Sequence, residues 1–172
     1  APGNNSYFYP SVGLSFVATD AIEALKNNDI LSFAKVTVSN STVYNDLAAY
    51  RLNETYTKQS SFPMGSLNGF YLSGTTVDAN IKKEKLNTTE IGFNFGFLKS
   101  RISLDASYFV TKTTDLITNT TPSIASAATN FLTNIGELQG KGIELTLGGR
   151  VLNARDFSWD LSINYSSNET KV

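Results

Sequence analysis

Six stretches of the chain alternate between apolar residues and small or polar residues. This period of two is typical of a β-strand with one apolar face. The clearest example surrounds the short turn Leu98-Lys99-Ser100, where apolar residues occupy the odd positions before the turn and the even positions after it. The pattern predicts strands over residues 7–18, 31–39, 89–97, 102–110, 134–149 and 157–166.

The connections between these stretches alternate in length. Those at residues 19–30, 98–101 and 150–156 are short to moderate, whereas those at about 43–86 and 113–133 are long. Alternate connections of an up-and-down antiparallel sheet fall at the same end, so the short ones are expected at one end and the long ones at the other. Within 19–30, Asp20 and Glu23 have the spacing of a capping box, which predicts a short helical turn.

The fifth stretch fits the pattern less well in its first part. Continuing the register of Ile143 toward the N-terminus places Glu137, Gln139 and Lys141 on the apolar side. Either a β-bulge at one of the glycines at 140 and 142 shifts the register, or this part of the strand lies in water.

The series opposite the apolar one consists mostly of Ser, Gly, Thr and Asn, with few charges. A soluble sandwich and a soluble barrel remain alternatives, but their solvated faces usually carry more Lys and Glu. A transmembrane barrel needs runs of about ten residues with apolar side chains outward and polar side chains inward. We expect five lumen-facing charges: Lys35, Glu90, Asp105, Glu144 and Asp160. The expected lipid-facing residues are Ile91, Phe93, Phe95, Ile102, Leu104, Ala106, Tyr108, Trp159, Leu161 and Ile163.

The number of predicted strands is too small to form a closed barrel. Six strands do not close a transmembrane barrel, since single-chain barrels have at least about eight, and an open sheet would leave two unpaired edges in lipid. The fold class is therefore predicted to be all-β, with residues 1–172 forming about six strands of a larger antiparallel transmembrane β-barrel. No signal peptide is visible, which agrees with an internal fragment.

The composition removes several classes of function. The chain has no His and no Cys, a net charge of -1 and 17% charged residues. No catalytic residue, metal site or cofactor is predicted, and the lack of basic surface argues against a nucleic-acid partner. The carboxylates Glu90, Asp105, Glu144 and Asp160 would allow a carboxylate hydrolase only at a defined separation across a substrate, so lumen charges are the favoured interpretation.

Several ordered motifs carry a family resemblance. They are Gly96-Phe97-Leu98, Tyr108-Phe109, Thr114-Asp115-Leu116-Ile117, Asn134-Ile135-Gly136-Glu137, Lys141-Gly142-Ile143-Glu144-Leu145 and Trp159, with Tyr9-Pro10-Ser11-Val12 upstream. In this order they resemble the C-terminal barrel region of the SusC/RagA family of TonB-dependent transporters. The segment 33–46 departs from the family pattern, because Asn40, Ser41 and Tyr44 stand where the family has an aromatic residue and glycines.

The resemblance implies a bacterial outer-membrane importer without a cofactor. Its expected partners are a SusD-like surface lipoprotein, TonB acting through an N-terminal region with a plug outside this chain, outer-membrane lipid, and an oligosaccharide substrate. A peptide importer of the RagA type is one alternative. A non-transporting outer-membrane adhesin is another.

The long stretch 43–86, expected to be extracellular like 113–133, contains scattered aromatic residues. Aromatic rings stack on sugars and tyrosine hydroxyls add hydrogen bonds, so these residues are candidates for contact with a ligand or the lipoprotein lid. The other interpretation is that they anchor the long connection on its neighbours. The candidates are Tyr50, Tyr56, Phe70 and Tyr71.

Overall fold

The structure is a computed structural model that describes residues 7–26, 28–48, 50–53, 55–60, 67–72, 74–126 and 128–172. The chain divides into two compact units. The first, here called the sheet unit, comprises residues 8–43, 86–112 and 138–172. The second, the connection unit, comprises Tyr7 and the described parts of 44–85 and 113–137.

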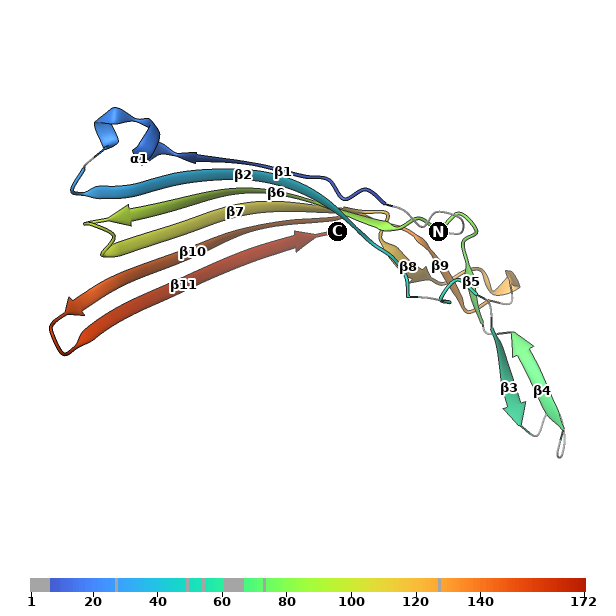
Figure 1. Cartoon of the computed structure of the whole chain (residues 1–172). Helices are drawn as coiled ribbons and strands as arrows, with labels where there is room; N and C mark the ends of the chain where they lie inside the picture. The colour runs from blue at the N-terminus through green and yellow to red at the C-terminus, as the bar shows by residue number, and fades with distance from the viewer. Residues whose placement is uncertain are drawn as a thin grey trace. The chain divides into compact units, whose positions relative to one another are not determined.

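Six long strands form one sheet in the order β1-β2-β6-β7-β10-β11, so each strand lies beside the long strand nearest to it in sequence (Figure 1). This confirms the predicted meander of six strands. Both pairs with a described register, β1 with β2 and β10 with β11, are antiparallel. The strands are β1 (Ser11–Val17), β2 (Leu31–Asn45), β6 (Glu84–Phe97), β7 (Ile102–Thr114), β10 (Leu138–Asn153) and β11 (Ser158–Lys171).

The three short connections of the sheet lie at the same end, as predicted (Figure 1). The first contains helix α1 (Ala18–Ala21) and the 3₁₀ turn η1 (Glu23–Leu25). The predicted capping box is wrong: α1 begins after Val17, before Asp20 is reached, and no side chain caps it. Among the described residues no helix has the length and apolar content needed to cross a membrane.

The β6–β7 turn is built from three consecutive residues with positive φ. Leu98, Lys99 and Ser100 have φ angles of 53°, 57° and 60°. None of them is glycine, so each carries a steric cost of its Cβ in the left-handed region. Contacts of this turn with the neighbouring connection, described below, hold it in that conformation.

The register of β10 against β11 decides between the two interpretations of the fifth stretch. Pairing is unbroken from Gln139–Lys171 to Arg150–Asp160, so no bulge occurs at Gly140 or Gly142 on this side. The irregularity lies instead between Arg150 and Leu152, where β10 has one residue more than β11. Gln139 and Lys141 therefore stay on the same face as Ile143.

The connection unit contains strands that the hydrophobic pattern did not predict. A two-stranded hairpin is formed by β3 (Tyr56–Ser60) and β4 (Asn68–Leu72). A small sheet has the order β5-β9-β8, in which β5 (Thr75–Val77) is parallel to β9 (Asn130–Asn134) and β8 (Ile117–Thr120) is antiparallel to it. The 3₁₀ turn η2 (Ile124–Ser126) precedes β9. These strands have three to five residues, too few for a period of two to stand out.

Burial differs from that of a protein with a hydrophobic core. Among the described hydrophobic residues, only Ala34, Ile81 and Leu132 are buried. Large apolar side chains of the sheet are exposed, from Leu14 (77%) in β1 to Ile163 (55%) in β11. The sheet therefore has an apolar face that this chain does not cover.

Candidate functional site

The apolar face of the sheet unit is formed by side chains that meet across the strands. Leu14 lies opposite Val38 and Phe16 opposite Val36, and on the other side of the sheet Leu145 lies opposite Tyr165 and Leu147 opposite Ile163. Such cross-strand pairs stabilise a sheet even when nothing packs above them. The predicted lipid-facing residues all belong to this face by their position in the strands.

Aromatic rings make a continuous stripe on β6 within this face. The ring centroids of Phe93 and Phe95 are 6.3 Å apart with nearly parallel planes, and those of Phe95 and Phe97 are 6.1 Å apart. Residues two apart on a strand point to the same side, so the stripe follows from the sequence alone. It places a large apolar area in the middle of the sheet.

The opposite, polar face carries the five predicted charges. The Asn94 side-chain amide donates to Asp105 Oδ1 over 2.6 Å between β6 and β7. Arg150 Nε donates to Asp160 Oδ1 at 3.0 Å across the β10–β11 pair. Lys35 is flanked by Ala34 and Val36, which belong to the apolar face. Asp105 and Asp160 thus line one wall, where one pairs with an amide and the other with a cation.

Glycines leave room for larger neighbours on the polar face. The Phe109 ring of β7 occupies the space where Gly142 of β10 would carry a Cβ. A Cβ on Gly148 would lie 2.7 Å from Ser103 Oγ, which is closer than such atoms approach. This close fit favours glycine at positions 142 and 148 and agrees with the inner side of a curved sheet.

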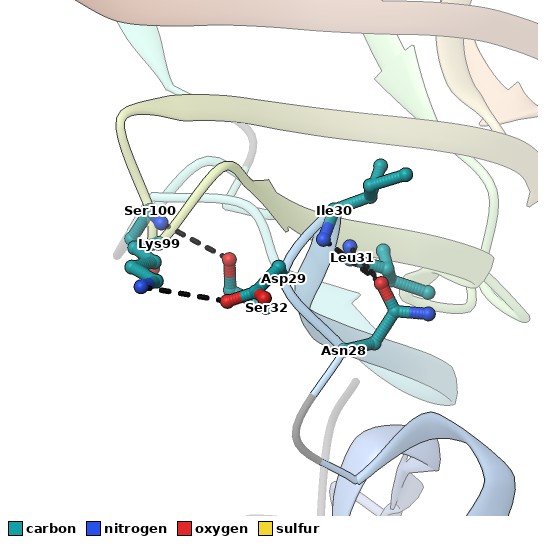
Figure 2. Close-up of polar contacts among 7 residues, drawn as sticks. All are labelled: Asn28, Asp29, Ile30, Leu31, Ser32, Lys99 and Ser100. Atoms are coloured by element: carbon teal, nitrogen blue, oxygen red, sulfur yellow. Dashed lines mark hydrogen bonds and ion pairs between the residues drawn. The ribbon is translucent and has the colours of Figure 1, made fainter.

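The short-turn end of the sheet is tied together by polar contacts (Figure 2). Asn28 Oδ1 accepts hydrogen bonds from the backbone N–H groups of Ile30 (2.8 Å) and Leu31 (3.1 Å) and so fixes the start of β2. Lys99 Nζ lies 3.4 Å from Asp29 Oδ1, and the Ser100 N–H donates to Ser32 Oγ at 3.2 Å. These contacts hold the β6–β7 turn against the β1–β2 connection.

A hollow of about 380 Å³ lies at the same end on the polar side of β7, β10 and β11. Its lining includes Lys99, Arg101, Arg150 and Asp160, together with small residues such as Ser103. Arg150 already pairs with Asp160. No group of three or more metal-ligating side chains occurs in the part of the chain that the structure describes.

Side chains of the connection unit bind its backbone. Asn134 Oδ1 accepts from the Lys82 N–H at 2.6 Å, while its Nδ2 donates to the carbonyl oxygens of Lys82 (2.9 Å) and Asp115 (2.6 Å). Asp115 has a positive φ of 56°. One amide thus joins segments 19 and 52 residues away in sequence. The motif blocks contained both Asn134 and Asp115, but nothing in their order indicated this contact.

Two carboxylates of the connection unit have lowered pKa values. A hydrogen bond from Lys83, whose Nζ lies 2.8 Å from Asp46 Oδ2, lowers the pKa of Asp46 below its usual 3.8. The backbone N–H of Asn80 and the hydroxyl of Thr133 both donate to Asp78 and lower its pKa as well. Lys83 also lies 3.2 Å from the centroid of the Tyr7 ring, a cation–π contact.

The structure brings three of the four candidate aromatic residues together on the β3–β4 hairpin. Tyr56 pairs with Leu72, and Phe70 pairs with Lys58 on the same face, whereas Tyr71 points to the other face. Tyr56 and Phe70 are 72% and 67% exposed. Tyr50 is separate from them in a turn, 84% exposed and with a φ of 66°. Rings this exposed are accessible to a ligand or a partner.

Known proteins are similar to this chain in sequence and in the arrangement of strands. A profile of the family described as "TonB dependent receptor-like, beta-barrel" matches residues 1–172. The TonB-dependent receptor SusC of Bacteroides thetaiotaomicron is 26% identical over 170 residues, which are 95% of this chain and 17% of that receptor. The TonB-dependent receptor P3 of Formosa agariphila is 30% identical over 106 residues, covering 62% of this chain and 10% of the receptor.

The solved structures agree with the sequence relatives. The structure of the RagAB peptide transporter superposes with a TM-score of 0.83 and 21% identity, covering 99% of this chain and 19% of that one. The RagAB peptide importer in the open-open state gives a TM-score of 0.81 with 21% identity, covering 98% of this chain and 18% of that one. The chain spans less than a fifth of the length of each of these proteins. The similarity to the two solved structures shows that the chain has the same fold as that part of them.

Proposed function

The chain belongs to the TonB-dependent receptor-like β-barrel family, and from this premise we propose that it forms part of an outer-membrane importer of a nutrient. The predicted resemblance to the SusC/RagA family is confirmed by the SusC relative and the RagAB structures. The relatives are described as receptors, which supports the prediction that the chain is not an enzyme.

The observation that carries the proposal is the uncovered apolar face beside a polar one. In a bilayer every backbone polar group of a spanning segment must be paired within the protein, and a closed sheet meets this condition. We therefore assign the apolar face to lipid and the polar face to the lumen. A Lys or Arg at the lipid midplane would cost about 2–4 kcal/mol, and the charges of the strand centres all lie on the polar face.

The chain's lack of cysteine provides a direct test of this assignment, because single cysteines are then the only thiols within it. The single variants Phe93→Cys and Asn94→Cys place thiols at adjacent positions on opposite faces of β6. In the barrel that contains this chain, embedded in vesicles, a water-soluble maleimide is expected to label the Asn94→Cys variant readily and the Phe93→Cys variant hardly at all. Equal labelling of the two variants would refute the assignment.

For the substrate we propose an oligosaccharide, captured together with a SusD-like surface lipoprotein and imported with energy from TonB. The support is the resemblance to the SusC/RagA family, which implies such a substrate, and the exposed rings of the β3–β4 hairpin, since aromatic faces stack on sugar rings. In this arrangement the long connections lie outside the cell, where Tyr56 and Phe70 meet the ligand or the lid. TonB would act through an N-terminal region with a plug, outside this chain.

A peptide is the second candidate substrate, favoured by the likeness to the RagAB peptide importer. Uptake of labelled oligosaccharides and of labelled peptides by cells with and without the gene separates the two. A protonophore should abolish uptake, because TonB draws on the proton gradient. Binding of either ligand at the cell surface without uptake would instead favour the non-transporting adhesin.

A further inference from the structure

The apolar face of the sheet unit ends abruptly toward the ends of the strands opposite the short turns. Its last mainly apolar row runs through Leu14 and Val38, and the next positions along β2 are Asn40 and Thr42. On β10 and β11 the positions beyond Ile143 and Tyr165 are Lys141, Ser167 and Glu169, which share that face by the unbroken register. Among the described strand residues, Val12 of β1, Val110 of β7 and Tyr44 of β2 still continue the apolar series. This boundary resembles the edge of a hydrocarbon layer.

On β2 and β6 the residues at this boundary are asparagines and threonines that form hydrogen bonds with one another. Asn40 Nδ2 donates to Thr89 Oγ1 at 2.8 Å and to Asn87 Oδ1 at 3.2 Å, while Asn87 Nδ2 donates to Thr42 Oγ1 at 3.0 Å. These side chains satisfy one another. This part of the boundary therefore offers few groups to a ligand.

On β10 and β11 the boundary is cationic. Lys141 and Lys171 lie 3.3 Å and 3.1 Å from the two oxygens of Glu169, and the side chains of both lysines are more than half exposed. Lys112 of β7 is exposed on the same face, two positions beyond Val110. Two ammonium groups thus share one carboxylate. Glu169 holds both of them at the surface. Lys141, Glu169 and Lys171 together carry one net positive charge.

Two adjoining hollows of about 280 and 260 Å³ lie at these lysines. Both are lined by Tyr108, Lys141 and Glu169. The lining of one also includes Tyr165, and the lining of the other also includes Val110 and Lys171. Tyrosines with one apolar and one polar side are enriched where a membrane meets water. In the two hollows, the tyrosine rings therefore lie next to the ammonium groups of the lysines.

The distance along β11 from Trp159, at one end of the apolar face, to Glu169, beyond its other end, is compatible with a bilayer. Trp159, near the short turn, and Glu169 are ten positions apart on β11, which is about 34 Å along an antiparallel strand. A tilt of about 40° projects this onto about 26 Å, close to the apolar band of outer-membrane barrels. Lys141, Glu169 and Lys171 then lie at the headgroup level on the side of the long connections.

We propose that Lys141 and Lys171, with Lys112 on the same face, bind the phosphate of a lipid headgroup in the outer leaflet. Tyr108 and Tyr165 line the upper part of its acyl chains. The proposal rests on the proposed membrane orientation but not on the substrate. Lysines bind phosphate as point charges, and their position on the outward face, continuous with the apolar band, selects a lipid as its carrier.

The test uses the complete barrel protein in detergent, and its probes are lipid A with its phosphates, chemically dephosphorylated lipid A and inorganic phosphate. The double variant Lys141→Gln/Lys171→Gln is expected to bind phosphorylated lipid A about 30-fold more weakly, since each lysine near such a surface contributes about fivefold. Lys141→Arg/Lys171→Arg should retain binding, which separates loss of charge from loss of folding. Lys26→Gln/Lys35→Gln, which also removes two positive charges but lies away from the boundary, is the matched control.

Wild-type protein should prefer phosphorylated over dephosphorylated lipid A, and added salt should weaken the binding. Equal binding of both lipids, or a double variant that binds like wild type, would overturn the inference. So would inorganic phosphate that competes as well as the lipid does. Uptake of the substrate, measured in the same variants, reports separately on the proposed function, because the boundary lies on the outward face and not in the lumen.

Discussion

The sheet unit and the connection unit satisfy their polar backbone groups in different ways. In the six long strands the hydrogen bonds of the ladder do this, and the side chains remain free to present one apolar and one polar face. In the connection unit the strands are short, and side chains such as Asn134 and Asp78 bind backbone groups directly. Regular pairing leaves side chains available for the environment, whereas irregular chain consumes them to hold its own shape.

The largest expected effect comes from placing a charge on the apolar face. Phe93→Lys should destabilise the folded barrel in vesicles by about 2–4 kcal/mol, because the ammonium would lie in hydrocarbon. Asn94→Lys, one position further on the polar face and beside Asp105, should cost less than about 1 kcal/mol. Urea titration of the reconstituted barrel measures both, and equal losses would abolish the distinction between the faces.

The next effect is confined to the connection unit. Asn134→Ala removes three hydrogen bonds to Lys82 and Asp115 and should lower the free energy of local opening by about 1–3 kcal/mol. Hydrogen exchange should then be faster in β8 and β9 and unchanged in β10 and β11. Asn119→Ala in β8, which is exposed, is the control. Faster exchange throughout the sheet would show that the two units unfold together.

Acid should loosen the connection unit. The pKa values of Asp46 and Asp78 are lower in the folded protein than their usual 3.8, so their contribution to stability is present above that value and is lost as the pH falls through the folded values. Proteolysis by an acid-stable protease below about pH 3.8 should therefore begin in the connections. Asp46→Asn/Asp78→Asn should make this cleavage nearly independent of pH, and an unchanged acid transition would contradict the assignment.

The smallest effect on stability is expected on the exposed hairpin. Tyr56→Ala and Phe70→Ala should change the free energy of unfolding by less than about 0.5 kcal/mol, because both rings are exposed. Binding of the oligosaccharide or the lipoprotein should nevertheless weaken. Tyr71→Ala, on the other face of the hairpin, distinguishes a one-sided contact from a general role of the aromatic residues. Normal binding by all three variants would favour another contact region.

Much of the sheet was predictable from the alternation, because a period of two assigns each side chain to a face without any knowledge of the neighbouring strand. The up-and-down order was predicted as well, and in that order the alternating lengths of the connections placed the short ones at one end. The ends of the strands were less predictable: β2 reaches Asn45 and β10 reaches Asn153, past the points where the apolar series stops. There the backbone hydrogen bonds of the sheet continue, although the side chains no longer alternate between apolar and polar.

The candidate site divides in the same way. The charges on the polar face were predicted from their register, whereas Tyr56 and Phe70 were chosen only by residue type, and their common face depends on the β3–β4 register. The contacts of Asn134 were missed altogether. An asparagine in a polar stretch gives no sign of the backbone that it binds 52 residues away.

The sequence by itself determined that each long strand has an apolar and a polar face, since this depends only on positions along one strand. The tertiary structure decided which residues become neighbours across strands. Lys141 meets Glu169 only because β10 pairs with β11 without a bulge until Arg150. Register is a property of two strands, and a shift of one residue would move every side chain of one strand to the other face.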